Sequence, residues 1–199
     1  YAILSTFADS CSSWCYRKIL LIKTNQNGDT TWTKKYIYSA WDLFAEDFKQ
    51  TADGGYIICA CDINYIFGSS NFILIKTNSV GDTLWTKSYG GYNNPNIFSF
   101  PNSVIQTSDG GYAIAGSTDV YGAGGTDVYV IKTNSSGTPQ WHRTFGGIND
   151  EYGTSIKQTS IGEYVVGGYT RSFTSNGDND FYLLKLNSSG NLIWSSTFG

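Results

Sequence analysis

Eight carboxylates lie on the side of the molecule where we expect its long loops, so they could meet a ligand there. Two carboxyl groups held roughly 5–10 Å apart can cleave a glycosidic bond, one as the acid and the other as base or nucleophile. No motif surrounds them, so solvated loop acids are the preferred interpretation and a glycosidase ranks third among the functions weighed below. The residues are Asp42, Glu46, Asp47, Asp62, Asp119, Asp150, Glu151 and Asp178.

Two short stretches, Asp178-Asn179-Asp180 and Asn149-Asp150-Glu151, carry oxygen ligands of the kind that Ca²⁺ takes. Neither has the complete pattern of a calcium loop, and Asp and Asn also cap turns. Turn capping is therefore preferred, and we expect no cofactor and no metal site.

His142 is the only histidine. The equivalent positions of the repeat described below hold Thr33, Thr86 and Ser195, so this position accepts any polar residue. A catalytic base needs a specific ionisable group. The sequence offers no convincing Ser/His or Cys/His arrangement in which His142 would activate a nucleophile. The sequence predicts a protein that is not an enzyme.

Four cysteines, Cys11, Cys15, Cys59 and Cys61, lie near one another in the repeat. A zinc site would need all four, at spacings unlike paired Cys-x-x-Cys motifs, so disulfides are favoured. Cys11 and Cys15 enclose a short loop, whereas Cys59 and Cys61 share one strand face, which disfavours their pairing and leaves a bridge between neighbouring repeats open. Oxidised cysteines fit an extracellular compartment, and free buried thiols are the alternative.

The elements that must position these residues belong to a repeat. A tryptophan recurs at intervals of 53, 56 and 53 residues, at Trp32, Trp85, Trp141 and Trp194. A lysine precedes each by nine residues and a glycine by four. Asp-Gly-Gly-Tyr occurs at 53–56 and 109–112, and a degenerate Ile-Gly-Glu-Tyr at 161–164. Such self-similarity is the signature of a repeat architecture.

Each repeat carries signals for four short strands. In the third repeat these are 103–107, 112–118, 127–133 and 138–145, with glycine turns between the first pair and the last pair. The third strands are apolar on both faces, so each sheet must be covered on both sides. The sequence predicts an all-β protein: a β-propeller of four blades of ~54 residues.

The whole chain, 1–199, is assigned to one domain, with repeats of about 1–37, 38–90, 91–146 and 147–199. Since the chain starts inside a repeat, the first blade lacks its first strand, which favours a piece of a larger array over a closed ring. The edge at residues 1–6 would expose unpaired N–H and C=O groups. A neighbouring copy adding a strand there would build a head-to-tail filament.

Composition and charge exclude several classes of protein. With 16% aromatic, 40% hydrophobic and 15% charged residues, the chain can bury a core and is not disordered. The net charge is −3 and no basic run exists, which argues against nucleic acid as a partner. No apolar run approaches the ~18 residues of a membrane span.

The pattern Asp-x-Tyr-x-x-Lys-(Thr/Leu)-Asn-Ser-Ser-Gly-x-x-x-Trp, followed by Phe-Gly-Gly and Gln-Thr-x-Asp-Gly-Gly-Tyr, resembles the Trp-containing propeller repeats of large secreted surface proteins of bacteria and archaea. The resemblance covers nearly the whole chain; 127–147 and 103–116 match best, and 7–17 and 37–47 depart. It implies an extracellular or cell-surface location and a role in adhesion. It implies no catalytic residue, because the shared residues are turn formers and core.

Antiparallel strands place the long, varied loops of such blades on one side, where binding residues concentrate. Aromatic side chains in these loops predict a contact surface for a protein or a glycan: Trp14, Trp41, Tyr65, Tyr92, Phe98, Tyr121, Tyr152 and Phe173. On the other side, Asn134 and Asn187 head N-x-Ser sequons and are candidate glycosylation sites.

The predicted function is a non-enzymatic extracellular propeller that presents its long loops for adhesion or assembly, with filament formation as one mode. A carbohydrate-binding module of a secreted protein is the alternative, and a glycosidase comes third.

Overall fold

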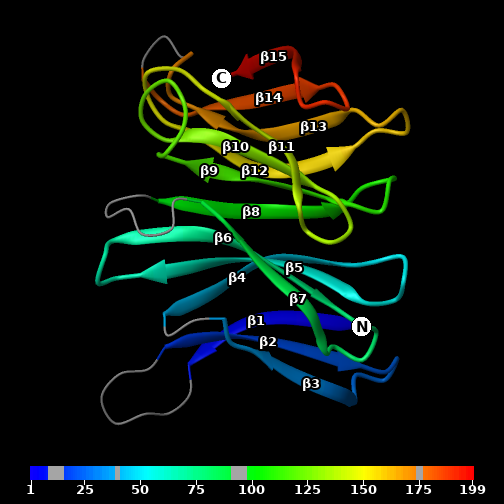
Figure 1. Ribbon diagram of the computed structural model, residues 1–199. Helices are drawn as coiled ribbons and strands as arrows, with labels where there is room; N and C mark the ends of the chain where they lie inside the picture. Colours follow the sequence, from blue (N-terminus) through cyan, green and yellow to red (C-terminus); the bar gives the residue numbers. More distant parts are fainter. Residues whose placement is uncertain (9–15, 39–40, 91–97, 174–176) are drawn as a thin grey trace.

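The structure is a computed structural model that describes residues 1–8, 16–38, 41–90, 98–173 and 177–199 (Figure 1). Its strands form four antiparallel sheets, each consecutive along the chain. Blade 1 consists of β1 (Ala2–Ala8), β2 (Arg17–Thr24) and β3 (Thr30–Tyr36), and blade 2 of β4 (Asp42–Gln50), β5 (Tyr56–Asn64), β6 (Ser69–Thr77) and β7 (Thr83–Tyr89). Blade 3 consists of β8 (Ser99–Gln106), β9 (Tyr112–Thr118), β10 (Asp127–Thr133) and β11 (Pro139–Phe145), and blade 4 of β12 (Glu151–Gln158), β13 (Tyr164–Thr170), β14 (Asp180–Leu186) and β15 (Leu192–Phe198).

This architecture confirms the predicted four propeller blades, including the first blade of only three strands. Consecutive blades pack face to face, and the first strand of blade 3, β8, contacts both β4 and β12. Figure 1 shows the blades in order from blade 1 at the bottom to blade 4 at the top. The described strands of blades 1 and 4 form no extensive contact with each other, so the blades form an open arc. No helix of the described structure is long and apolar enough to span a membrane.

The first strand of each complete blade is longer than its sequence signal. β8 begins at Ser99 instead of residue 103, and its register shifts between Pro101 and Ser103. Shifts at the same place interrupt β4 and β12. A bulge breaks the alternation of buried and exposed side chains along a strand. The alternating sequence pattern therefore reveals only the part of each first strand that follows its bulge. The connections that precede β4, β8 and β12 are correspondingly shorter than the sequence signals predict.

A lysine of the third strand ties down the turn between the first two strands. Lys76 Nζ lies 2.8 Å from the Asp53 carboxylate, and Lys132 Nζ lies 2.8 Å from that of Asp109. In blade 4 the turn lacks this aspartate. Glu163 occupies the position of the second glycine instead and pairs with Lys185 at 2.7 Å, so the degenerate turn keeps its ion pair.

The recurring tryptophan joins each blade to the next. Edge-to-face ring pairs with centroid separations of 6.0, 5.8 and 5.6 Å connect Trp32 to Tyr56, Trp85 to Tyr112 and Trp141 to Tyr164. The hairpin glycine of the following blade lies under each indole, where a Cβ would come within about 3 Å of the ring; the glycines are Gly81, Gly137 and Gly190. Aromatic pairs of this geometry stabilise beyond their buried area, and the motif explains the common register of Trp and Gly.

The cysteine prediction is corrected for the two described residues. Cys59 and Cys61 are buried free thiols, as in the alternative interpretation. Cys59 belongs to the apolar cluster between blades 2 and 3, and the Cys61 thiol lies 3.8 Å from the carbonyl oxygen of Ser99 in β8. Both sulfurs therefore face blade 3, away from blade 1, and neither forms the bridge to the preceding repeat that the sequence left open. Cys11 and Cys15 lie outside the described residues.

Candidate functional site

The long loops and the connections between blades leave the sheets at one end, because the strands alternate in direction (Figure 1). Aromatic rings with at least 36% of their surface exposed gather there on blades 2, 3 and 4: Tyr65, Phe67, Phe98, Phe100, Tyr121 and Phe173. We call this end the long-loop side. The exposed rings of the long-loop side offer apolar surface that a partner could contact.

Within the long-loop side, most rings pair locally. Phe98 stacks on Phe100 with ring centroids 6.1 Å apart, and Tyr121 lies 5.6 Å from the ring of His142. Phe173 packs at 5.6 Å on Tyr182 of its own blade. These pairs fix the orientation of the exposed rings but do not merge them into one cluster.

Other predicted contact residues lie elsewhere. Trp41 is half-buried and meets Tyr16 edge-on at 6.4 Å, which joins the approaches to β2 and β4. Tyr152 lies in β12 instead of a loop and stacks on Tyr169 of β13 at 4.8 Å. Trp14 and Tyr92 lie outside the described residues.

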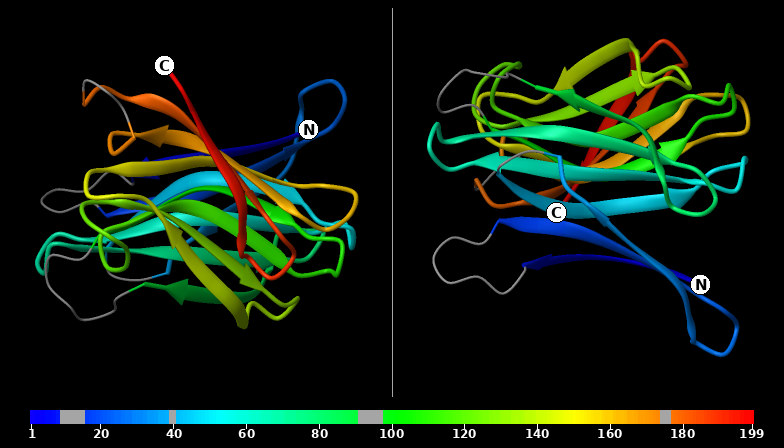
Figure 2. Two further views of the ribbon diagram at one scale, coloured as in Figure 1. Left: turned by 90° about the horizontal axis from the view of Figure 1, so that it is seen from above. Right: turned by 60° about the horizontal axis from the view of Figure 1, so that its bottom comes forward.

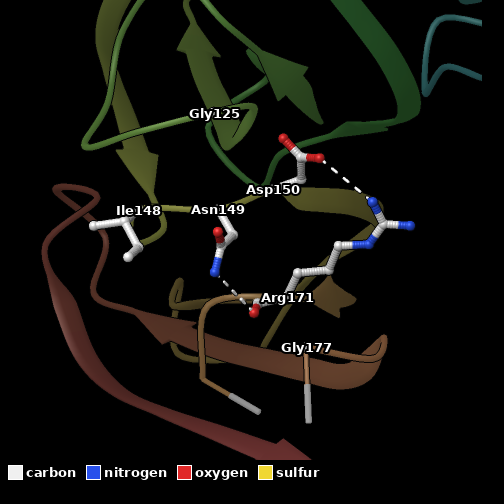
Figure 3. Close-up of a pocket in the computed structure, with 6 residues that line it drawn as sticks. All are labelled: Gly125, Ile148, Asn149, Asp150, Arg171 and Gly177. Carbon is white, nitrogen blue, oxygen red and sulfur yellow. Dashed lines mark hydrogen bonds and ion pairs between the residues drawn. The ribbon is translucent and has the colours of Figure 1, made fainter. Parts of the chain in front are cut away.

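A hollow of about 330 Å³ on this side lies where blade 3 meets blade 4. Its lining comes from the β9–β10 loop, the connection to β12 and the β13–β14 loop: Gly125, Ile148, Asn149, Asp150, Arg171 and Gly177. Figure 3 shows the Arg171 guanidinium directed at the Asp150 carboxylate, and the two groups are 3.6 Å apart.

Hydrogen bonds hold the polar groups of this pocket in place. The Thr126 N–H donates to Asp150 Oδ1 at 3.0 Å, and the Arg171 Nε–H donates to Asn179 Oδ1 at 2.8 Å. Asn149 donates its amide N–H to the Arg171 carbonyl at 3.2 Å. A Cβ on Gly125 would overlap Asp150 Oδ1, so only glycine allows this close approach. The pocket thus offers a preorganised carboxylate, amide and guanidinium at its rim.

The Phe173 ring lies near the connection that leads to Ile148, although it is not part of the pocket lining. A Cβ on Gly147, next to Ile148, would lie 3.4 Å from the Phe173 ring. Ile148 itself is 80% exposed. An apolar surface bordered by few, well-placed polar groups is the usual composition of a small-ligand site.

The sequence analysis predicts eight solvated loop acids. Three of these carboxylates are instead buried: Asp42, Asp62 and Glu151. Asp42 pairs with Arg17 at 2.9 Å. Glu151 opens β12 and accepts hydrogen bonds from the Thr170 hydroxyl at 2.6 Å and the Gly147 N–H at 2.6 Å. The bonds of Asp42 and Glu151 hold strands and connections together, a role that the sequence alone does not reveal.

Sequence reasoning overlooked a buried carboxyl group next to Glu151. Asp127 Oδ1 accepts no hydrogen bond from the described residues. A Cβ on Gly146 would overlap both Asp127 Oδ1 and Glu151 Oε2, so the two carboxyl groups lie close together. Burial, and then the charge of Glu151, raises the pKa of Asp127. The described residues hold no group of three or more His, Cys, Asp or Glu side chains arranged for a metal ion.

The candidate glycosylation residues lie in the hairpins on the opposite side. Asn134 Oδ1 accepts the N–H groups of Ser136 and Thr138 at 3.0 and 2.9 Å. Asn187 makes the same two turn bonds, to Ser189 and Asn191. The turn explains the asparagine in both sequons, and their modification stays a prediction.

Comparison with known proteins supports the fold. The family model described as "Domain of unknown function (DUF5122) beta-propeller" matches residues 162–192, which lie in blade 4. The Regulatory protein FlaEY of Caulobacter vibrioides is 29% identical over 120 residues, which amount to 54% of this chain and 12% of that protein. The chain therefore spans only a small part of this curated relative.

Two solved structures are similar at low identity. A protein from Bifidobacterium bifidum described as a "putative exo-beta-1,3-galactanase" gives a TM-score of 0.52 at 12% identity, covering 92% of this chain and 63% of that one. A Bacteroides caccae protein of unknown function gives a TM-score of 0.38 at 12% identity, covering 91% and 78%. The first similarity concerns the fold alone. The chain is built of β-propeller repeats.

Proposed function

We propose that this chain is a non-enzymatic binding module, extracellular or on the cell surface, whose long-loop side contacts a protein partner in adhesion or assembly. The observation that carries the proposal is the set of exposed rings on three consecutive blades, oriented by local ring pairs. Aromatic residues are enriched where proteins meet. A rigid stack of sheets keeps these rings in fixed positions, which lowers the entropy cost of binding.

The test is adhesion of beads coated with the chain to cells of the organism that carries its gene. A triple variant, Tyr65→Ser, Phe67→Ser and Phe173→Ser, should lose most adhesion, because each ring is about half or more exposed. The matched control carries Leu84→Ser and Ile161→Ser, which are 57% and 74% exposed but lie away from the long loops. Equal adhesion of both variants, or no adhesion of the unmodified chain, would overturn the proposal.

Carbohydrate binding is the second candidate, and the pocket between blades 3 and 4 favours it. Asn149, Asp150 and Arg171 offer hydrogen-bonding groups in the pocket, and the half-exposed Phe173, near Gly147, offers a ring for the apolar face of a sugar. A glycan array should then show binding that disappears in Phe173→Ala and in Asn149→Ala. Hydrolysis of a bound glycoside that Asp150→Asn abolishes would instead favour a glycosidase.

A further inference from the structure

A second hollow lies at the junction of blades 3 and 4, at the end opposite to the long loops. It has a volume of about 400 Å³, within the range of about 300–1,000 Å³ that small-ligand sites occupy. Its walls come from the β8–β9 turn, the β12–β13 turn, the β14–β15 hairpin and the start of β11. The first two turns lie side by side at the right in Figure 1 and in the left-hand view of Figure 2. We call this hollow the turn-side pocket.

A buried ammonium group fixes the polar wall of the turn-side pocket. The side chain of Lys132 is only 4% exposed. Its Nζ donates to the Asp109 carboxylate at 2.8 Å and to Gln140 Oε1 at 2.9 Å, and a third bond reaches the backbone carbonyl of Thr133 at 2.8 Å. The Asp109 side chain is nevertheless 54% exposed, and Gln140 is exposed as well. Both acceptors are therefore held in position while they remain open to a ligand.

These polar groups offer a ligand both acceptors and donors of hydrogen bonds. Burial acts to raise the pKa of Asp109, but hydrogen bonds from Lys132 and Thr107 outweigh it and hold the pKa at about 2. The carboxylate is therefore charged at neutral pH and accepts hydrogen bonds. Because the ammonium takes Oε1 of Gln140, the other end of this amide is its NH₂ group, which finds no acceptor among the residues that the structure describes. The exposed Ser188 borders the same space.

An indole ring supplies the apolar wall of the turn-side pocket. Trp141 is partly exposed and meets Tyr164 edge-on, with ring centroids 5.6 Å apart. A Cβ on Gly190 would lie 2.7 Å from the indole, so the hairpin backbone packs closely against it. These contacts hold the ring in one orientation. The two charged side chains of the lining, Lys132 and Asp109, compensate each other, so the pocket favours a ligand without net charge.

We propose that the turn-side pocket binds one pyranose ring of a neutral saccharide. A pyranose combines a C–H face, which packs on an aromatic ring, with hydroxyl groups that both donate and accept hydrogen bonds. The indole of Trp141 takes the C–H face, the Asp109 carboxylate accepts from a hydroxyl group, and the Gln140 amide donates to one. The pocket shares no residue with the long-loop side, so this inference does not rest on the proposed function.

The preceding junction shows that the fold does not require the polar wall. Between blades 2 and 3, Trp85 meets Tyr112 edge-on and Lys76 forms the same ion pair with its turn. Leu84, however, occupies the position of Gln140 and is 57% exposed. A leucine side chain neither accepts from the lysine nor donates to a ligand. The framework therefore forms without Gln140, and the place of this amide beside an indole fits a role in binding.

The test titrates the methyl glycosides of glucose, galactose, mannose and N-acetylglucosamine into the isotope-labelled chain and follows the indole N–H signal of Trp141 by nuclear magnetic resonance. Trp141→Phe identifies this signal by its loss. At least one of the four sugars should shift the signal until it saturates. Gln140→Leu should then weaken the binding about tenfold, because the sugar loses a hydrogen bond. Blade 2 carries a leucine at this position, so the variant should fold.

The matched control is Thr31→Leu, because Thr31 is exposed at the corresponding position of blade 1; it should leave the affinity unchanged, as should Asn149→Ala in the pocket on the long-loop side. Unchanged circular dichroism shows that each variant folds. A Trp141 signal that none of the four sugars shifts would overturn the proposal, as would binding that Gln140→Leu leaves intact. Binding lost in Asn149→Ala alone would assign the sugar to the long-loop side and overturn it as well. The adhesion test above uses other residues, so the two proposals fail separately.

Discussion

The carboxylate of Glu163 lies 2.7 Å from the ammonium of Lys185, in the position that Asp53 and Asp109 fill from two residues earlier in their turns. Both side chains are largely buried. Glu163→Ala should therefore destabilise the fold by about 1–2 kcal/mol, because the lysine loses its charged partner. Urea denaturation followed by tryptophan fluorescence measures the effect.

The Asp-Gly-Gly turns of blades 2 and 3 suggest a second variant that should restore the lost stability. Ile161 occupies the place of the missing aspartate, so Ile161→Asp combined with Glu163→Gly rebuilds the Asp-Gly-Gly turn and should recover most of the loss. Failure of this double variant to exceed Glu163→Gly alone would show that the ion pair is not what the turn requires.

Acid should weaken the intact turns. A hydrogen bond from Lys76, with one from Thr51, holds the pKa of Asp53 at about 2 in the folded chain, below the ordinary value near 4. The folded state then binds fewer protons than the unfolded state, so this contribution is present at neutral pH and is lost as the pH falls from about 5 toward 2. Urea midpoints between pH 7 and pH 3 should fall less for Asp53→Asn than for the unmodified chain.

Asp127 should show the opposite dependence. Burial, followed by the charge of Glu151, raises its pKa, so the folded chain prefers the neutral carboxyl group. Asp127→Asn should raise the free energy of unfolding at pH 7, and the gain should shrink as acid protonates the carboxyl group of the unmodified chain. Blade 2 holds Asn71 at this position, beside Gly90 as Asp127 is beside Gly146.

Denaturation at pH 7 and pH 4 tests this reversal. Asp127→Ala is the control, because it also removes the acceptor of the Ala123 N–H at 3.1 Å and should not stabilise. A loss of stability in Asp127→Asn at pH 7 would show that the charged carboxylate is needed.

The parts of the fold that sequence predicts are those in which local pattern and tertiary role coincide. The predicted strands 112–118 and 127–133 match β9 and β10, because apolar runs lie between turn glycines there. The predicted first strand of blade 3 starts only at residue 103, because the bulge between Pro101 and Ser103 interrupts the alternating pattern before it. The pocket was missed for another reason: Asp150 and Arg171 come from different loops, and no spacing records which loops meet.

The last prediction concerns a hydrogen bond that joins blade 1 to blade 2 and blade 2 to blade 3 but is missing between blades 3 and 4. The Tyr36 hydroxyl donates to the Gly81 carbonyl at 2.8 Å, and the Tyr89 hydroxyl donates to that of Gly137 at 2.7 Å. Phe145 stands at the same position before Gly190 and has no hydroxyl. Phe145→Tyr should therefore add a hydrogen bond and stabilise the chain by about 0.5–1.5 kcal/mol.

Two variants bracket this expectation in the same urea experiment. Tyr89→Phe should destabilise by about 1–3 kcal/mol, because it leaves the Gly137 carbonyl without this donor. Phe198→Tyr should change the stability little, because Phe198 is 56% exposed. If Phe198→Tyr stabilised the chain as much as Phe145→Tyr, the gain at position 145 would not require a hydrogen bond between blades, since position 198 is largely exposed.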